Sequence, residues 1–364
     1  MKLYKIVLLL CFLLVNQFLE ASNGEKFSHM DEKKIHREFK YKPGMLLNVH
    51  NSYGNIDITA WEGNKIIVDA LVIVKGETKA EVDELLKKVD IAFSENLKEG
   101  IITLLTRKET YKYNDYREIH YQIKVPKSCH LSITNNYGDI SLDASNASVS
   151  LKAYYGNIKA GKLNGVAKIE TSFSQRNSFD YIKKGTIKGQ FCDYKIMKSE
   201  VLEIRDMASS NGVIQEVSNL KYKCNYGSLT IGNVTNSLEG KGEYLTMNIE
   251  NSNVQEKMKI EAYYGYVDIK NWNNYSAEFD IDNAKLILGY NNNISFGYNI
   301  LTRDCIVESI INNLPKDFKR HHSDDKGNNQ RICGYFKEKF SKNYLLLEMV
   351  NSILKFENSK PITP

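Results

Sequence analysis

The sequence predicts an all-β chain, a single-stranded right-handed parallel β-helix (β-solenoid) with one short helix near its N-terminal end and an irregular C-terminal cap. The first reason is a dipeptide that recurs along the chain. It occurs at Tyr53-Gly54, Tyr137-Gly138, Tyr155-Gly156, Tyr226-Gly227 and Tyr264-Gly265. A motif that is repeated through one chain is typical of repeat architectures.

The second reason is that apolar residues follow each dipeptide at constant offsets. Three residues after the tyrosine come Ile56, Ile140, Ile158, Leu229 and Val267. Five residues after it come Ile58, Leu142, Ala160, Ile231 and Ile269. Eight residues after it come Trp61, Ser145, Leu163, Val234 and Trp272. We expect these positions to line the core, with Trp61 and Trp272 at equivalent places in their coils.

The third reason is the period of the pattern between the dipeptides. Apolar and polar residues alternate, as in 229–231, 245–249 and 267–269, which is the period of strands. From Tyr137 onward, aromatic residues recur at similar short intervals, except for one longer interval that begins at Tyr194. They are Tyr155, Phe173, Tyr194, Tyr226, Tyr244 and Tyr264. Such units leave no room for a crossover helix. Seven or eight stacked coils would make a rod of roughly 35–40 Å.

We expect the tyrosines to stack as a ladder at one corner of the coil, with the following glycine supplying a positive-φ turn. The long interval before Tyr226 contains Ser210-Asn211-Gly212-Val213, which can serve as a degenerate turn. A β-sandwich is the competing fold, but its strand pairs are not tied to one turn motif at a constant offset. The ladder could also be an aromatic platform for sugar, although its fixed offset to the core favours a structural stack.

Residues 1–21 read as an export signal. Lys2 and Lys5 precede the apolar run Ile6–Val15, which is too short to span a bilayer, and Ala21 offers a cleavage site. Cys11 follows Leu10 rather than a small residue, so we expect cleavage and not lipid attachment. No later stretch is long and apolar enough for a transmembrane helix. The sequence thus predicts a soluble, exported protein located in the periplasm, at the cell surface or outside the cell.

The mature chain divides into three regions. Residues 22–130 hold strands, a helix, the first coil and a cap; residues 131–300 hold the repeats; residues 301–364 hold a loop and closing strands. The helix is predicted at 79–89 by an apolar stripe and a capping box formed by Thr78 and Glu81. The polar segment 315–330 is expected to be a loop, and the closing strands are expected at 344–349 and 353–356.

Charge and cysteine content exclude few functions. The formal charge is +5, and it becomes +4 when Lys2, Lys5 and Glu20 leave with the signal, which gives little support to nucleic-acid binding. The remaining cysteines are Cys129, Cys192, Cys224, Cys305 and Cys333. Their wide spacing argues against a disulfide scaffold. Cys192 and Cys224 are expected to be buried, and a Cys305–Cys333 pair is left open.

No catalytic, cofactor-binding or metal-binding residue emerges from the sequence. The outward position four residues after each tyrosine holds Asp57, Ser141, Lys159, Thr230 and Asp268, which share no chemistry. His321 and His322 lie near Asp324 and Asp325, but adjacent histidines in a polar segment are more often solvated than metal-bound. The motifs of zinc proteases, serine hydrolases and P-loop proteins are absent.

The chain resembles the bacterial "putative adhesin" β-solenoid domain family. The resemblance is carried by Phe39–Ile58 (FKYKPGMLLNVHNSYGNIDI), the helix at 80–89 and Tyr121–Leu142 (YQIKVPKSCHLSITNNYGDISL). These motifs describe turns and strands rather than a site. The resemblance implies an exported β-helix and brings no catalytic residues. Residues 173–222 and 315–330 depart from the family pattern.

We therefore expect an exported, non-enzymatic protein that presents an extended binding surface, adhesin-like or associated with the cell envelope. Its partner is unknown, with a glycan or an envelope protein as candidates and no nucleic acid. Two alternatives are a carbohydrate-active β-helix enzyme, either lyase or hydrolase, and a periplasmic scaffold or sensor partner. A cluster of acidic residues with Arg or Lys on one face would favour the enzyme.

The first prediction concerns processing. We expect the exported protein to lack residues 1–21, because the short apolar run after Lys5 ends near the small residue Ala21. The intact mass of the exported protein measures this directly. A mass that includes residues 1–21, or a lipid adduct on Cys11, would contradict it.

Overall fold

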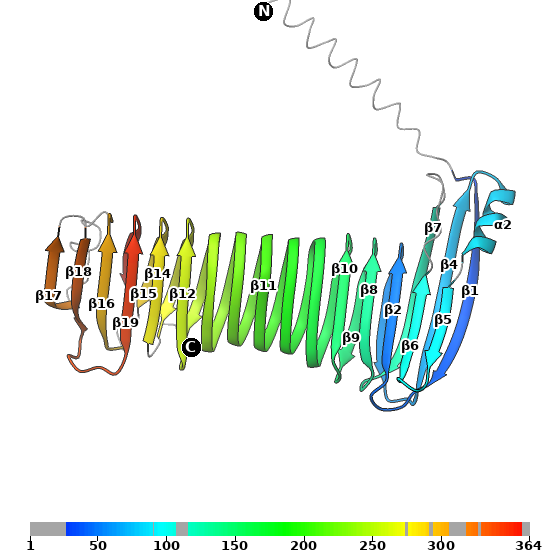
Figure 1. Cartoon of the computed structure of the whole chain (residues 1–364), viewed down its shortest axis with the longest axis horizontal. Helices are drawn as coiled ribbons and strands as arrows, with labels where there is room; N and C mark the ends of the chain where they lie inside the picture. The colour runs from blue at the N-terminus through cyan, green and yellow to red at the C-terminus, as the bar shows by residue number, and fades with distance from the viewer. Residues whose placement is uncertain are drawn as a thin grey trace, which may run out of the picture.

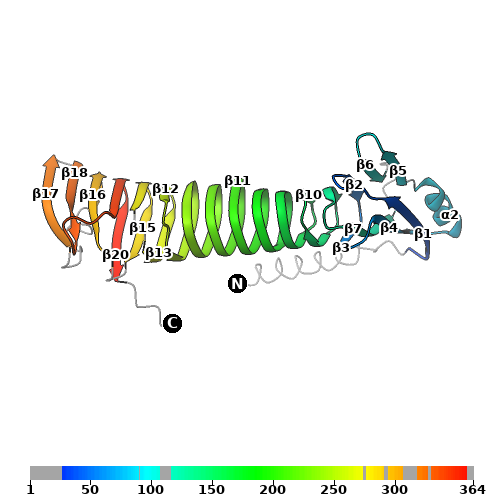
Figure 2. The ribbon, with the colours of Figure 1, turned by 90° about the horizontal axis from the view of Figure 1, so that it is seen from below.

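The computed structural model describes residues 27–89, 91–106, 116–273, 276–290, 294–305, 318–326 and 329–358. The export signal expected at 1–21 lies outside these residues. Within them the chain is all-β with a single helix, and every strand belongs to one large sheet. The molecule is a long rod with parallel strands along its middle and antiparallel strands at both ends (Figures 1 and 2).

The N-terminal end is an antiparallel cap around the first strands of the rod. Its elements are β1 (His29–Lys40), β2 (Leu46–Ser52), β3 (Ile56–Trp61), β4 (Lys65–Gly76), α2 (Lys79–Lys88), β5 (Ile91–Asn96), β6 (Ile101–Thr106) and β7 (Tyr116–Pro126). β4 pairs antiparallel with β1 and β7, and β5 with β6. Helix α2 lies against β1 and β4 and buries Val82 and Leu85. Its predicted capping box between Thr78 and Glu81 is confirmed.

The middle of the rod is built from parallel strands. They are β8 (His130–Asn136), β9 (Ile140–Ser145), β10 (Val149–Tyr154), β11 (Ile158–Ser252), β12 (Lys257–Tyr263), β13 (Tyr266–Trp272), β14 (Ser276–Asp282) and β15 (Lys285–Tyr290). Leu131 pairs with Val149, and Val149 pairs in turn with Ala167. Every one of these segments therefore hydrogen-bonds to the segment one repeat later. A β-sandwich, which is made of antiparallel sheets, lacks this pairing.

The C-terminal end is closed by two parallel strands and an antiparallel set. The elements are β16 (Phe296–Arg303), β17 (Phe318–Lys326), β18 (Asn329–Phe336), β19 (Tyr344–Val350) and β20 (Ile353–Asn358). β19 pairs with β14 and β20 with β15, which confirms the two closing strands. The loop expected at 315–330 is wrong for 318–326 and for 329–330, because these residues form β17 and the start of β18, which pair with each other. Polar strands are stable there because β17 lies at the end of the rod (Figure 1).

The corner of each repeat is a residue in the left-handed region, with φ between 45° and 63°. In order along the rod, these corner residues are Tyr53, Tyr137, Tyr155, Phe173, Phe191, Ser209, Tyr226, Tyr244, Tyr264, Asn283, Asn351 and Asp304. The corner N–H donates to the carbonyl just before the next corner, as from Tyr137 to Tyr154 at 2.8 Å. The described corners outnumber the seven or eight coils that we expected.

The expected role of the glycines is wrong for most of them. The tyrosine itself carries the positive φ, and only Gly54 and Gly227 among the following glycines share it. The others are needed for space: a Cβ on Gly156 would overlap the carbonyl oxygen of Gly138 in the preceding repeat. Where a serine follows the corner, as at Ser174, its hydroxyl donates to the Gly156 carbonyl instead. Close backbone approach, more than turn geometry, selects glycine.

The predicted core positions are confirmed at all three offsets, with one residue, Trp61, as the exception. Residues three and five after each tyrosine are buried, and so are Ser145, Leu163, Val234 and Trp272. Trp61 is only half-buried, because its indole folds over the turn before β4 and its Nε1 donates to the Lys65 carbonyl at 3.0 Å. Cys192 and Cys224 are buried as expected, and Cys305 and Cys333 are free thiols.

The second prediction tests why the glycines are there. Gly156→Ala should lower the free energy of unfolding by roughly 1–3 kcal/mol, because the new methyl group meets backbone that cannot move aside. Gly212→Ala is the control: its Cβ would meet only the ends of the Leu229 and Met207 side chains, at 3.0 and 3.7 Å. We expect it to change the stability by less than about 1 kcal/mol. Equal losses in urea denaturation would contradict the steric explanation.

Candidate binding surface

The most regular surface feature is a stack of exposed aromatic rings, which we call the ladder. Its rings belong to Tyr53, Tyr137, Tyr155, Phe173, Phe191, Tyr226, Tyr244 and Tyr264. Neighbouring centroids are 4.8–5.3 Å apart and the planes differ by 3–12°. Each residue is 45–57% exposed. The stacked ladder that the sequence predicts is therefore present on the outside of the rod.

The ladder offers solvent mainly its edges. Inside a run of stacked rings both faces of a ring are covered by its neighbours, as Tyr155 is by Tyr137 and Phe173. A ring face becomes available only where a run ends. The ladder has two runs, from Tyr53 to Phe191 and from Tyr226 to Tyr264. At the break, Phe191 and Tyr226 each stack on a ladder ring on one side only.

The residue at the break is Ser209. Its φ of 49° is that of the other corners, so the repeat has its corner here without a ring, although Asp206 three residues earlier is also left-handed. Contacts between repeats place it between Phe191 and Tyr226. The next residue, Ser210, accepts from the Cys192 N–H at 3.0 Å, and a Cβ on Gly227 would overlap its carbonyl oxygen.

The corner at Ser209 was not predicted from the sequence, because the repeat was traced by its tyrosines. Tyr194, expected on the ladder, is buried in the core, where its hydroxyl lies 2.6 Å from the Thr171 hydroxyl. Phe191 takes the corner instead, and with Ser209 it divides the stretch from Phe173 to Tyr226 into nearly equal steps. The signal that could have found it is the aromatic residue one repeat after Phe173. The degenerate turn expected at 210–213 begins one residue earlier, at Ser209.

Polar side chains flank the break on both sides in the chain. Two residues after the corners, Asn211 donates to the Asp193 carboxylate at 2.9 Å, and Ser228 donates to the side-chain amide oxygen of Asn211 at 2.7 Å. One residue before the corners come Gln190, Ala208 and Asn225, which are exposed or half-buried. The break is thus bordered by amides, a carboxylate and a hydroxyl, with small residues at its floor.

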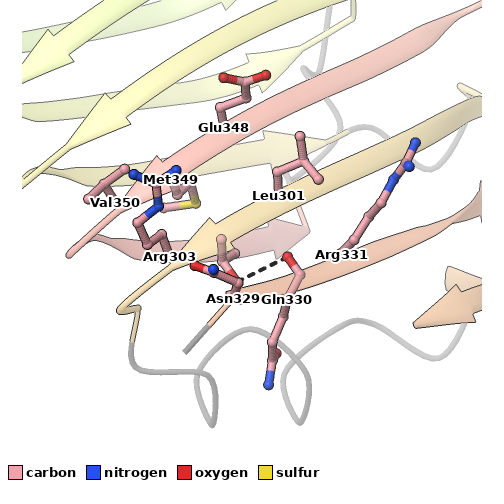
Figure 3. Close-up of a pocket in the computed structure, with 9 residues that line it drawn as sticks. Leu301, Arg303, Asn329, Gln330, Arg331, Glu348, Met349 and Val350 are labelled. Carbon is pink, nitrogen blue, oxygen red and sulfur yellow. Dashed lines mark hydrogen bonds between the residues drawn. The ribbon is translucent and has the colours of Figure 1, made fainter. Parts of the chain in front are cut away.

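A shallow hollow lies at the C-terminal end, between β16, β18 and β19. It has a volume of about 320 Å³, and Figure 3 shows Arg303, Arg331 and Glu348 pointing in different directions from its wall. Arg331 is engaged with Asn299, to whose side-chain oxygen its Nε donates at 3.1 Å. Since no pair of these charged groups converges, the hollow offers no acid–base arrangement.

A second hollow, of about 370 Å³, lies on β10 and β11 and is bordered by Lys152, Lys168, Lys188, Arg205 and Glu170. Lys152 pairs with Glu170 at 3.0 Å, and Tyr154 donates to the same carboxylate at 3.1 Å. The hydrogen bond from Lys152 lowers the pKa of Glu170, so this carboxylate is ionised at neutral pH. The hollow is a mixed-charge surface with only one carboxylate among its lining residues.

The outward positions after the tyrosines are only partly brought together. The register places Asp57 beside Ser141 and Ser141 beside Lys159, on adjacent strands. Thr230 and Asp268 lie further along the rod.

The buried cysteines are not candidates for nucleophilic chemistry. Burial raises the pKa of Cys129 and Cys224 to about 12, so these thiols stay protonated at neutral pH. Because the thiolate is the reactive form of cysteine, both side chains are poor nucleophiles.

The described residues contain no group of three or more side chains that could hold a metal ion. His321, His322, Asp324 and Asp325 fall on β17, and their side chains lie outside what the structure describes. In the described part of the chain, the one helix is too short and too polar to cross a bilayer.

Comparison with protein-family models finds no match, and neither does comparison with curated proteins. Among solved structures, a putative cell adhesion protein from Clostridium sporogenes matches at 10% identity over 90% of this chain and 100% of that chain, with a TM-score of 0.18. A putative adhesin from Bacteroides fragilis matches at 13% identity over 90% and 97%, with a TM-score of 0.21. Likeness this distant carries no argument, so the family resemblance stays a prediction.

The third prediction measures what the ladder contributes. Tyr155→Asn removes two stacking contacts, whereas Tyr53→Asn removes one. Asparagine tolerates the left-handed corner, as Asn283 and Asn351 do. We expect losses of about 1–3 kcal/mol for Tyr155→Asn and about half as much for Tyr53→Asn. Urea denaturation compares the two, and equal or negligible losses would mean that ring stacking does not stabilise the rod.

Proposed function

We propose that the chain is an exported, non-enzymatic β-solenoid that presents an extended surface for binding, in an adhesin-like or envelope-associated role. The observation that carries the proposal is the exposed ladder. Its aromatic residues stand 45–57% exposed in one line, on corners that cost strain to hold. Aromatic rings in a regular line, most of them with a phenolic hydroxyl, stand beside amide and carboxylate side chains. Such a surface suits a long partner of repeated chemistry, such as a glycan, or an elongated envelope protein.

The parallel register supports the solenoid part of the proposal. In β8, β10 and the start of β11, each residue pairs with its counterpart one repeat later, and β11 pairs in the same way with β12. A rod of this kind positions equivalent corners at strand spacing, about 4.8 Å. Its surface is therefore periodic in the same way as a polymer. A fold of this kind also hosts enzymes, so the non-enzymatic part rests on the site alone.

The single carboxylates in two hollows of the described surface favour binding over catalysis at those places. Hydrolysis or elimination at a glycosidic bond needs two carboxylates, or a carboxylate with a base, at a defined separation. In two hollows of the described surface the acidic groups are single, Glu348 in one and Glu170 in the other. A third hollow, of about 570 Å³ at the N-terminal end, is lined by Glu38, Glu95 and Glu99 together with lysines, so the enzyme alternative has to be tested there. The exported location follows from the expected signal peptide, and a nucleic-acid partner remains disfavoured by the mild net charge.

The fourth prediction tests binding and turnover together. Purified mature protein should bind a subset of glycans on an array and should not degrade pectins, alginates, glucans or chondroitin-type glycans, with or without calcium. Turnover that disappears when one acidic residue is replaced by its amide would establish the enzyme alternative. An array without any bound glycan would shift the proposal to a protein partner, which pull-down from envelope fractions would then have to find.

A further inference from the structure

We propose that the break in the ladder at Ser209 is a binding slot for a single pyranose ring, held between the faces of Phe191 and Tyr226. The inference rests on the proposed binding function and gives it a place and a ligand class. It starts from the backbone. Ser209 has the same left-handed corner as the aromatic residues on both sides, so the coil leaves the position of one ring vacant.

The width of the slot follows from the spacing of the strands. Phe191 and Tyr226 stand two repeats apart, so their rings are separated by about 10 Å, twice the strand spacing. A ring placed midway would lie about 5 Å from each wall, which matches the 4.8–5.3 Å between neighbouring ladder rings. Ala208 and Ser209 form a floor of small side chains. Both walls are exposed, at 53% for Phe191 and 57% for Tyr226.

The borders of the slot decide between a sugar and an aromatic ring. Asp193, Asn211 and Ser228 form a hydrogen-bonded row on one side, and Gln190 and Asn225 precede the corners on the other. The same kind of polar row runs beside the rings of the ladder, where Asn157 donates to the Asp139 carboxylate, so these borders tolerate an aromatic ring but gain few hydrogen bonds from it. A pyranose has C–H groups on its faces and hydroxyls around its edge. Its hydroxyls can donate to Asp193 and accept from the amides.

The experiment fills the slot without disturbing the fold. Ser209→Tyr should join the two runs of the ladder, because tyrosine already occupies this corner conformation at Tyr155 and Tyr244. Saturation-transfer difference NMR of mature protein with methyl β-D-glucopyranoside, methyl β-D-galactopyranoside and methyl N-acetyl-β-D-glucosaminide measures contact with the sugar. We expect transfer from the wild type to at least one glycoside, equal transfer from Ser209→Ala, and none from Ser209→Tyr.

Wall variants keep the proposal testable if Ser209→Tyr fails to fold. Phe191→Asn and Tyr226→Asn should each weaken glycoside binding roughly two- to tenfold, the effect of losing one stacking contact. Gly156→Ala is the matched control, since it is expected to lower the stability of the rod by a similar amount without removing a ring, and it should leave glycoside binding unchanged. Weakening by Gly156→Ala equal to that of the wall variants would overturn the proposal, because the effect would then come from lost stability.

The remaining outcomes separate the slot from the wider function. No transfer to any of the three glycosides overturns the slot, as does displacement of a bound glycoside by an equal concentration of N-acetyl-L-tyrosinamide, which would indicate an aromatic occupant. If glycans bound on the array stay bound to Ser209→Tyr, the slot is wrong and the proposed function stands. If the array shows no glycan while the slot variants behave as the wild type, the slot is wrong and the proposed surface needs a protein partner.

Discussion

The left-handed corner with its stacked ring is the constraint on which the rest of the structure depends. A non-glycine residue in this conformation is strained by of order 1–3 kcal/mol, and the strain recurs at every repeat. Two interactions offset it: the corner N–H donates to the next repeat, as from Tyr53 to Asn136 at 2.8 Å, and each ring packs on its neighbours. Both require strict alignment of the corners. A slip of one residue would break the bond, the stack and the inward alternation together.

Alignment of equivalent residues has consequences beyond the corner, because identical positions stack on one another. Amides exploit this, since a side-chain amide both donates and accepts: Asn233, Asn251 and Asn271 form a chain of hydrogen bonds of 2.8 and 2.9 Å. Charged residues would repel if repeated, so opposite charges alternate between repeats, as in Lys198–Glu216 and Lys257–Glu239. Each exposed pair contributes little to stability. Their effect is to allow charged residues on strands that must stack in register.

Much of the fold follows from the sequence, and the features that could not be predicted have physical causes. The burial of Ile56, Ile140 and Val267 and the helix at 79–88 follow from periodicity, which is a local property of the chain. The role of the glycines could not be predicted from the sequence, because Gly156 is required by a carbonyl in the preceding repeat and not by its own turn. Tyr194 was misplaced because a tyrosine with a buried hydroxyl partner looks, in sequence, like one at a corner. β17 was missed because pairing at the end of a sheet does not need apolar alternation.

The candidate site is harder to predict from the sequence than the fold, because it is defined by a missing aromatic ring. In a continuous ladder each ring face is covered by the next ring, so the regular part offers a partner little more than ring edges. Sequence patterns reveal only this regular part. Ser209 breaks the ring pattern while it keeps the corner, and the neighbours of Ser210 at Cys192 and Gly227 place it one repeat from each of the flanking corners. A stabilising ring is missing where the backbone strain is still present. Since a tyrosine there would add two stacking contacts, the serine lowers stability, which is the pattern expected of a position that serves binding.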